Sequence, residues 1–416
     1  PKILASEVVN DQMDLVDWGK YDLDGDGWVD RLLILHTSIG QEEGGNSNRI
    51  WSHFTNLDEP IDLPNGLKIG HYTMASLGTG ESGFGTMMHE MLHQLGAYDL
   101  YPSHGSINIH PWKGVGDWDI MANGNWNGGG KWPSLPTASA VFEIGGNTSI
   151  EIGNEWMESE TQGCVGPQYE LESISRGGNS LKIQVSNDEF VWIEYRDNYG
   201  YDSYLPGSGV LVTYQDLSAG DVDDNELNAN PDRPYLMVVE ADGNNGLITG
   251  ANDGEQGDLF TNGTRFGHQG TVVRSHDGLL VPWVADVEIT DKVYVNLSSP
   301  NCMPIFTLDT PNYGASLLPD ESIILAATTE QNCDLSINMV SSDGLVLYTN
   351  TTLLIKDKTT NIELYFSSTS NANSESMISG TIECGDSVYD YQTKVNIISR
   401  RPFETKFFGE IESYSN

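Results

Sequence analysis

One segment of this chain, residues 84–95, has the apolar period of an α-helix and carries two histidines one turn apart. Its apolar side chains recur every three or four residues, at Phe84, Met87, Met88, Met91, Leu92 and Leu95. Ser82 is placed to cap the start, and Gly96 stands where helices often stop. Because His89 and His93 are four positions apart, both imidazoles point the same way. We therefore expect a helix that presents both rings to one point.

The residues around these histidines form a zinc-binding pattern. His89-Glu-Met-Leu-His93 matches H-E-x-x-H, and Gly96 and Asp99 extend it to H-E-x-x-H-x-x-G-x-x-D. Gly96 permits a left-handed turn that would bring Asp99 back toward the metal. Ligation by His89, His93 and Asp99 would leave a position for water, and Glu90 would be the base that takes the proton of that water. The pattern predicts peptide hydrolysis by Glu-assisted attack of a zinc-bound water.

Other residues after the helix compete for some of these roles. Chance alone would produce H-E-x-x-H in on the order of one such chain in a hundred, so the extended pattern favours Asp99 as the third ligand. The rival ligands are Asp117, Asp119, His104 and His110. Met121 follows a glycine-rich turn and resembles the Met-turn beneath the zinc of the metzincin superfamily, although a flexible core side chain is the plainer interpretation. The candidates for an oxyanion donor are Asn123, Tyr98 and Tyr101.

A second metal site is predicted near the start of the chain. In Asp22-Leu-Asp-Gly-Asp-Gly-Trp-Val-Asp30, carboxylates stand at positions one, three, five and nine and a glycine at position six, as in a calcium-binding loop. Position twelve is Leu33 rather than Glu, so the loop is not a complete EF-hand. We expect calcium to be bound by Asp22, Asp24, Asp26, Asp30 and the Trp28 carbonyl, and the alternative is a solvated acidic turn. A weaker second calcium group is Asp253, Glu255 and Asp258.

Charge and length limit the classes of function. The 416 residues include 60 acidic and 20 basic side chains, for a formal net charge of −40. Such a surface repels nucleic acid and anionic membranes, attracts divalent cations and suits salty water. No stretch approaches the roughly 20 apolar residues of a membrane span. We therefore expect a protein with neither nucleic-acid partners nor a membrane span.

The length and the pattern of strands predict several domains of α+β class. Residues 1–145 would form a zinc peptidase domain with a mixed sheet and an active-site helix, and 146–300 a β-rich companion domain. Residues 301–400 would form a β-sandwich, and 401–416 a tail. Predicted strands lie at 31–37, 69–75, 190–195, 209–214, 235–240, 323–327, 345–348, 362–366 and 393–398.

The four cysteines point to an oxidising compartment. They are even in number and include no C-x-x-C pair, which favours two disulfides over a zinc finger. Three pairings are open, and we favour Cys333 with Cys384 and Cys164 with Cys302. The chain also begins at Pro1, without a signal peptide, so it reads as a processed product of secretion to the extracellular space.

Together these residues resemble the immune inhibitor A family of secreted bacterial metallopeptidases. Four stretches carry the likeness: Tyr21 to Asp30, Ile50-Trp-Ser-His53, His89 to Asp99, and Gly116-Asp-Trp-Asp-Ile-Met121. Looser likeness follows in Glu194-Tyr-Arg196, Gly200-Tyr-Asp202 and Leu205-Pro-Gly-Ser-Gly209. The resemblance implies a metzincin-like domain, zinc, structural calcium and cleavage of extracellular proteins. It places His89, His93, Asp99, Glu90 and Met121 at the positions that match the family's zinc motif and Met-turn.

The chain departs from the family in one respect. Family members carry an opening strand, a long helix and a further strand before the calcium loop, whereas here only Pro1 to Val16 precede it, enough for the end of that helix. We expect the missing portion, cleaved off, to remain bound as a separate polypeptide, because a sheet edge would otherwise be exposed.

Two other functions compete with peptide hydrolysis. One is a calcium-stabilised module that binds a surface or a glycan and has lost peptidase activity, although the intact Glu90 argues against it. The other is a zinc hydrolase of small substrates, which a pocket closed by the acidic loops would favour. An open cleft would favour endopeptidase action on protein or peptide substrates.

Overall fold

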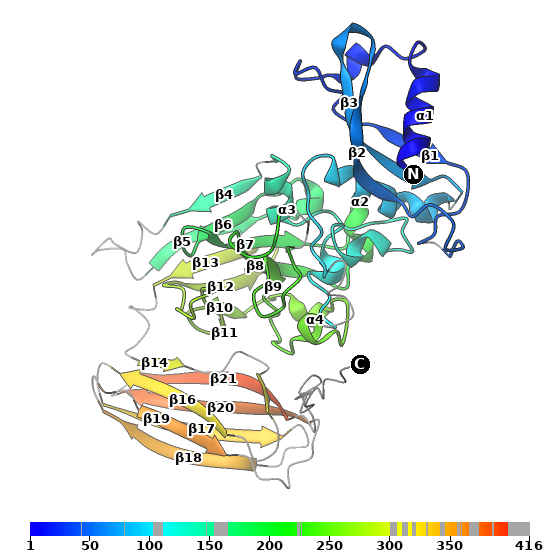
Figure 1. The fold of residues 1–416 in the computed structure, drawn as a ribbon. Coiled ribbons are helices and arrows are strands. Elements are labelled where there is room, and N and C mark those ends of the chain that lie inside the picture. The colour runs from blue at the N-terminus through cyan, green and yellow to red at the C-terminus, as the bar shows by residue number, and fades with distance from the viewer. Residues whose placement is uncertain are drawn as a thin grey trace, which may run out of the picture. The chain divides into compact units, whose positions relative to one another are not determined.

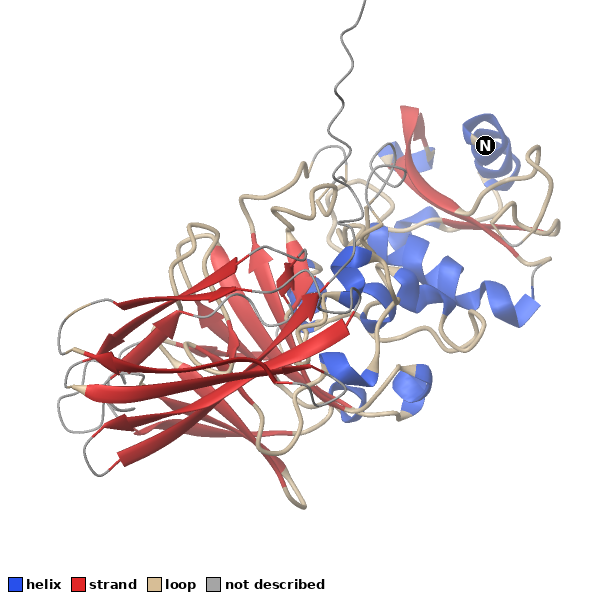
Figure 2. Cartoon of the chain, turned by 90° about the horizontal axis from the view of Figure 1, so that it is seen from below, coloured by secondary structure: helices blue, strands red, loops and turns tan. Residues whose placement is uncertain are grey.

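The computed structural model divides into two compact units (Figure 1). The first comprises residues 1–241, 245–268 and 273–298, and the second comprises 242–244, 269–272 and 299–416. The structure describes residues 1–299 apart from 43, 79, 103–110, 147, 154–164, 223–224 and 226. In 300–397 it describes the strands and a few residues beside them. Helices are few and sheets are several, which agrees with the α+β prediction (Figure 2).

The first unit opens with a helix and a three-stranded mixed sheet. The elements are α1 (Lys2–Gln12), β1 (Leu33–His36), β2 (His53–Asp62) and β3 (Lys68–Ser76). The central strand β3 runs parallel to β1 and antiparallel to β2. Helix α1 buries Ala5 in a cluster with Ile34 and Tyr72, and Val9 in a second cluster with Ile69. Burial of these apolar side chains fixes the helix on the sheet.

Strand β2 was not predicted, for two reasons visible in its sequence. Only some of its side chains are partly buried and none is fully buried, so it lacks a clear apolar alternation. It also contains Pro60, and its pairing with β3 shifts between Asn56 and Ile61. A proline within a run of residues argues against a central strand. Here β2 is an edge strand, where proline is tolerated.

The predicted helix is α2, which spans Phe84–His93. Ser82 is not its cap: Gly83 is the N-cap residue, and a 3-10 turn over Gly80–Gly83 leads directly into the helix. Past the helix, Gly96 has a φ of 97°, as expected for a residue that ends a helix in a left-handed turn. The backbone N–H of Ala97 then donates to the carbonyl of Leu92 at 3.1 Å. The chain therefore reverses at the glycine, as the sequence predicted.

The rest of the first unit is a pair of sheets with two short helices. One sheet has the order β4 (Ser149–Ile152), β6 (Ser180–Gln184), β7 (Glu189–Arg196), β8 (Gly209–Asp216) and β9 (Leu236–Val238). The other contains β10 (Arg265–Gly267), β12 (Val284–Ile289), β13 (Val293–Ser298) and β5 (Val165–Leu171). The helices are α3 (Ala138–Glu143) and α4 (Gly246–Thr249).

These two sheets share one apolar core. Its buried side chains come from both, among them Leu181, Ile193 and Val212 from the first sheet and Ala285 and Val295 from the second. The predicted strands at 190–195, 209–214 and 235–240 correspond to β7, β8 and β9. The predicted boundary near residue 145 stays a prediction.

The second unit contains two further sheets. One has the order β14 (Phe306–Asp309), β16 (Ser322–Thr329) and β19 (Thr360–Tyr365). The other has the order β15 (Ala315–Leu317), β21 (Ser387–Ile397), β20 (Ser374–Cys384), β17 (Cys333–Ser341) and β18 (Val346–Leu354). The two-residue strand β11 (Thr271–Val272) is also grouped with this unit. A sandwich of the two sheets stays a prediction.

The cysteines are described only in part. Cys333, 1% exposed, is not a free thiol, and it begins β17, while Cys384 ends the antiparallel strand β20. Asp334 lies opposite Glu383, so the register agrees with a Cys333–Cys384 pair, which stays a prediction. Cys164 and Cys302 lie outside the described residues. Within the described part of the chain, none of the helices is long and apolar enough to cross a membrane.

Candidate metal centre and active-site cleft

Helix α2 and the turn after it bring three potential ligands together. His89, His93 and Asp99 each offer one atom within 4.8 Å of the others. The Oδ1 atom of Asp99 lies 3.0 Å from Nε2 of His89 and 3.4 Å from Nε2 of His93. The side chains of all three are largely buried. The group is the one that the extended sequence pattern predicted.

The far side of each imidazole is held by a backbone carbonyl. Nδ1 of His89 lies 2.7 Å from the carbonyl oxygen of Ile120, and Nδ1 of His93 lies 2.7 Å from that of Ala97. A carbonyl only accepts, so Nδ1 must carry the proton when the ring is neutral. Both Nε2 atoms then offer a lone pair to a common point, which is how second-shell contacts prepare histidines for a metal.

The two carboxylate oxygens of Asp99 have different neighbours. Oδ1 faces the two histidines and forms no geometrically acceptable hydrogen bond within the described residues, although it is buried. Oδ2 accepts a hydrogen bond from Nδ2 of Asn225 at 2.7 Å. A buried carboxylate oxygen without a hydrogen-bond donor is costly unless a cation lies beside it. The arrangement of Oδ1 therefore fits a metal ligand.

Glu90 lies between the two histidines in sequence and is 9% exposed. Its Oε2 accepts a hydrogen bond from the backbone N–H of Phe54, on β2, at 2.8 Å. Its backbone carbonyl accepts from the hydroxyl of Thr73, on β3, at 3.0 Å. Gln94 adds a further link, because its side chain bonds both the N–H and the carbonyl of Leu32. Helix α2 and its glutamate are thus fixed to the sheet.

Burial and mutual charge set the protonation of the cluster. Burial opposes a charge on His89, but the Asp99 carboxylate outweighs it and raises the pKa of His89 to about 9 in the metal-free chain. Burial would raise the pKa of Asp99, but the two histidines beside its carboxylate outweigh burial and hold that pKa well below its usual range. Burial raises the pKa of Glu90. A metal cation would therefore compete with a proton for this site.

The Gly116–Met121 segment contacts the metal cluster, because its Ile120 carbonyl lies against Nδ1 of His89. A Cβ atom on Gly116, whose φ is 58°, would lie only 2.1 Å from the carbonyl oxygen of Asp253, so the close approach requires glycine. Asp119 is fully buried and accepts hydrogen bonds from the N–H of Met121, the N–H of Thr137 and the hydroxyl of Thr137. Met121 is fully buried, and its carbonyl accepts from the N–H of Leu100 at 2.8 Å.

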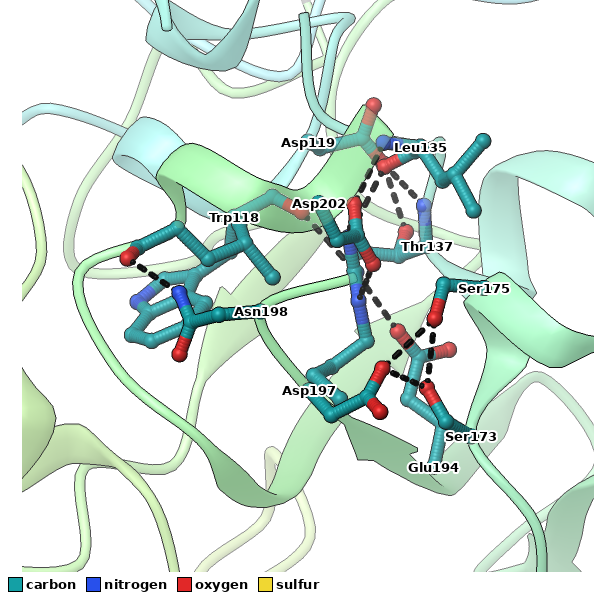
Figure 3. Close-up of polar contacts among 12 residues, drawn as sticks. Trp118, Asp119, Leu135, Thr137, Ser173, Ser175, Glu194, Asp197, Asn198 and Asp202 are labelled. Carbon is teal, nitrogen blue, oxygen red and sulfur yellow. Dashed lines mark hydrogen bonds and ion pairs between the residues drawn. The ribbon is translucent and has the colours of Figure 1, made fainter. Parts of the chain in front are cut away.

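A buried arginine from the downstream sheet supports this segment, and its partners Trp118, Leu135, Glu194 and Asp202 are labelled in Figure 3. Arg196, in β7, has no exposed surface and pairs with Asp202 at 2.8 Å and Glu194 at 2.9 Å. It also donates to the carbonyl oxygens of Trp118 at 3.0 Å and Leu135 at 3.2 Å. The guanidinium thus satisfies two carboxylates and two carbonyls at once, which is what a charge without access to water needs.

A cleft of about 540 Å³ opens beside the cluster. His89 and Glu90 line it, and so do Trp51, Trp126 and Lys113, from three other segments of the first unit. Of the candidate oxyanion donors, Asn123 and Tyr101 line the cleft, whereas Tyr98 packs against the apolar core. Burial, and then the charges of Asp99 and Glu90, raise the pKa of Tyr101, so its hydroxyl stays protonated.

Three buried polar atoms on the lining residues have no hydrogen-bond partner in the described part of the chain. They are Oγ1 of Thr86, Nε1 of Trp112 and Oδ1 of Asn125. Leaving such an atom unpaired costs about 1–3 kcal/mol, and ordered water or a bound ligand removes that cost. Because these atoms have almost no accessible surface, water held inside the wall of the cleft would be their partner.

The acidic loop before β1 is organised by its own backbone. The carboxylates of Asp22, Asp24 and Asp30 come within 4.8 Å of one another. Asp22 accepts hydrogen bonds from the N–H groups of Gly25 and Gly27, and Asp30 accepts from that of Leu23. Both glycines have positive φ, of 80° and 90°. Three of the predicted calcium ligands thus converge.

The other two predicted ligands of this loop are placed differently. Asp26 is exposed and its Oδ1 accepts from the N–H of Trp28 at 2.8 Å. It is outside the convergent group of three carboxylates. Trp28 forms an isolated bridge with Lys68, the first residue of β3. A calcium ligand role for Asp26 and for the Trp28 carbonyl stays a prediction.

The weaker calcium group and the rival zinc ligands have other partners. Asp253 pairs with Lys113 at 3.0 Å, Glu255 accepts from Asn252 at 2.6 Å, and Asp258 accepts from Nε1 of Trp118 at 2.8 Å. Calcium binding by these three carboxylates stays a prediction. Asp117 accepts from Asn123, while Asp119 holds the Met121 turn. His104 and His110 lie outside the described residues.

Sequence reasoning missed the contacts that position the site from a distance. The main ones are the Phe54 N–H on Glu90, Asn225 on Asp99, and Arg196 beneath the Trp118 segment. None belongs to a recognisable local pattern around the zinc motif. A charged residue in the strand-like run 190–196 was the one available signal, because a buried arginine needs partners.

Comparison with known proteins agrees with this site. Residues 4–156 match the family described as "Immune inhibitor A peptidase M6, catalytic domain". The chain is 28% identical over 173 residues to the "Pre-pro-metalloprotease PrtV" of Vibrio cholerae serotype O1, covering 38% of this chain and 18% of that protein. It is 29% identical over 249 residues to "Immune inhibitor A" of Bacillus thuringiensis subsp. alesti, covering 54% of this chain and 35% of that protein.

The chain thus spans about a third or less of the length of these curated relatives. Among solved structures, a putative β-galactosidase from Bacteroides fragilis overlaps 26% of this chain and 19% of its own, with 6% identity and a TM-score of 0.17. Overlap that low carries no argument about fold or function. The sequence matches support a metallopeptidase function, and residues 4–156 match the model of the immune inhibitor A peptidase family, the family that the sequence motifs resemble.

Proposed function

We propose that this chain is the catalytic part of a secreted zinc endopeptidase that cleaves extracellular proteins. The observation that carries the proposal is the convergence of His89, His93 and Asp99 beside Glu90, where His89 and Glu90 line a cleft. Secretion is supported by the family match and by the even number of cysteines.

The donor set suits zinc. Two imidazole nitrogens and one carboxylate oxygen are ordinary zinc ligands, and three protein ligands leave a position for substrate or water. Bonds of about 2.0 Å in a tetrahedron would put ligand atoms roughly 3.3 Å apart. The separations of 3.0 and 3.4 Å between Asp99 Oδ1 and the two Nε2 atoms fit that spacing.

Each residue then has a defined task. When bound, zinc would polarise the scissile carbonyl and acidify water. Glu90 would accept the proton that water loses and transfer it to the leaving amine, and its raised pKa suits that exchange. The Phe54 N–H holds one oxygen of Glu90 in place. Tyr101 and Asn123, on the lining of the cleft, are the candidates to donate hydrogen bonds to the carbonyl oxygen as it gains charge.

The cleft favours a peptide over a small substrate. Its lining includes Trp51 and Trp126, which are 56% and 38% exposed and offer flat apolar surfaces for side chains. The lining also includes Asn123 and Lys113, whose side chains carry hydrogen-bond donors. Both kinds of group match a polypeptide.

We also propose that Asp22, Asp24 and Asp30 hold a calcium ion with a structural role. Carboxylate oxygens are the ligands that calcium prefers. The loop lies directly before β1, so an ion there would fix the entry to the strand. Terbium luminescence, titrated with the parent and an Asp24→Asn variant, tests this assignment. Equal luminescence from both proteins would contradict it.

Casein hydrolysis by the zinc-loaded parent and a Glu90→Ala variant tests the main proposal, with zinc content measured in both. We expect one zinc per chain in each protein and activity in the parent alone. An active Glu90→Ala variant would refute the role of Glu90. A zinc-loaded parent that cleaves no peptide bond would contradict the peptidase assignment and favour a binding module.

A further inference from the structure

Asn225 makes a two-point contact with Asp99 from a loop far downstream. Its Nδ2 donates to Asp99 Oδ2 at 2.7 Å, and its Oδ1 accepts from the Asp99 backbone N–H at 2.9 Å. The two residues are 126 positions apart. One amide therefore fixes both the backbone and the carboxylate of Asp99.

This contact determines which oxygen of Asp99 faces the histidines. Rotation of the carboxylate would break the bond from Nδ2 of Asn225, so Oδ2 stays turned away. Oδ1 is left pointing at the two Nε2 atoms, at 3.0 and 3.4 Å. Outer partners that orient a metal ligand in this way commonly change metal affinity by 10- to 100-fold when they are removed.

The loop that carries Asn225 is itself anchored to the same segment. Asn228 is fully buried, and its Nδ2 donates to the carbonyls of Leu100 and Leu236, each at 2.9 Å. Its Oδ1 accepts from the N–H of Leu236, at the start of β9, at 3.0 Å. The segment Asp99–Leu100 is thus held by two asparagines of one loop, which in turn is fixed to the sheet.

The backbone at Asn225 also favours its residue type. Its φ is 54°, in the left-handed region that asparagine adopts more readily than most side chains. A replacement by alanine would therefore lose both hydrogen bonds and add backbone strain. A replacement by aspartate keeps the size and the acceptor but loses the donor and brings a second carboxylate against Asp99.

We propose that Asn225 is a positioning residue for the third metal ligand. This inference rests on the proposed function, because it requires His89, His93 and Asp99 to bind zinc. It assigns to the downstream loop a direct part in metal affinity. The loop then contributes to the metal centre without supplying a ligand.

Zinc affinity, measured by competition with a chromophoric chelator, tests this role in Asn225→Ala and Asn225→Asp. We expect both variants to bind zinc about 10- to 100-fold more weakly than the parent. The visible absorption of the cobalt-substituted protein should also shift in each, because the geometry of the Asp99 ligand changes. Asn198→Ala is the matched control: this asparagine donates to the Leu205 carbonyl at 2.9 Å, within the same unit, and that bond involves no residue of the metal cluster.

The control variant should lose stability but keep the zinc affinity and the cobalt spectrum of the parent. Zinc affinity within about threefold of the parent in both Asn225 variants would overturn the inference and leave the proposed function intact. An equal loss of affinity in Asn198→Ala would also overturn it, because the effect would then follow general stability. A parent chain that binds no zinc would refute the proposed function and this inference together.

Discussion

Two candidate metal sites of this chain, the His89 cluster and the acidic loop 22–30, differ in what holds their ligands. His89, His93 and Asp99 are buried, and their orientation depends on Ile120, Ala97 and Asn225. The carboxylates of the acidic loop 22–30 are more exposed and bond backbone N–H groups within the loop itself. The first site is therefore built by the fold of the whole unit, whereas the second is built by nine consecutive residues. A substitution far from the ligands should therefore weaken metal binding at the first site and leave the second site unchanged.

Among the changes considered, replacement of the buried Arg196 should have the largest effect on the first site. Arg196→Met leaves Glu194 and Asp202 buried without their cation, so we expect a loss of about 3–5 kcal/mol in the free energy of unfolding, measured in urea. Zinc affinity should fall as well, since Arg196 holds the Trp118 carbonyl. The control is Arg176→Met, at an exposed arginine paired with Asp197, which should change the free energy of unfolding far less because solvent screens that pair. Equal losses in the two variants would contradict the structural role of Arg196.

Removal of each metal in turn should show how much each site adds to the free energy of unfolding. Zinc at a hundred times its dissociation constant should add about 2.7 kcal/mol to the free energy of unfolding. At equal micromolar concentrations of the two ions, calcium should add less, because the acidic loop is less buried and its carboxylates already bond to the backbone. Thermal unfolding after selective chelation measures both increments. A larger increment from calcium would reverse the comparison.

The pH dependence of stability should differ between the metal-free and zinc-bound chains. The folded pKa of His89 is raised to about 9 from 6.5, so its charged form stabilises the folded metal-free chain. That contribution is complete below pH 6.5 and is lost as pH rises toward 9, with an expected effect of about 3 kcal/mol at most. Thermal midpoints recorded between pH 6 and 9.5 measure it. With zinc bound, His89 no longer titrates in this range, and the same slope in both forms would contradict the prediction.

The acidic loop should give the smallest effect. Asp22→Asn keeps one acceptor for the N–H groups of Gly25 and Gly27, so without calcium we expect a cost under about 1 kcal/mol. The increment from calcium should disappear, while zinc affinity stays at the parental value. Asp14→Asn, at an exposed aspartate outside the loop, is the control and should keep the calcium increment. A change in zinc affinity caused by Asp22→Asn would show that the two sites are coupled.

Local patterns in the sequence predicted the elements that depend on near neighbours. The period of apolar residues located α2, and the glycine at 96 located its reversal, because both follow from the geometry of a few consecutive residues. The spacing of His89, His93 and Asp99 then predicted that these three side chains lie close together, and they do. The error at Ser82 arose because a 3-10 turn continues directly into the helix, which leaves Gly83 at the cap position.

Contacts between distant segments could not be predicted in this way. Asn225 reaches Asp99 across 126 residues, and Phe54 reaches Glu90 from a strand with no clear apolar alternation. Asparagine and a backbone N–H carry no sequence signal of their partners. These contacts depend on tertiary packing, which a single sequence does not encode in any local period.

The buried Arg196 has a consequence for how this chain could be cut or recombined. The family match ends at residue 156, yet the arginine that holds Trp118 and Leu135 comes from a strand beyond that point. A gene fragment cut at residue 156 would encode the zinc motif without Arg196, which binds the carbonyls of Trp118 and Leu135. Recombination that exchanged the downstream sheet would have to transfer Arg196 and Asp202 with it. The unit that evolution can move intact is therefore longer than the segment by which the family is recognised.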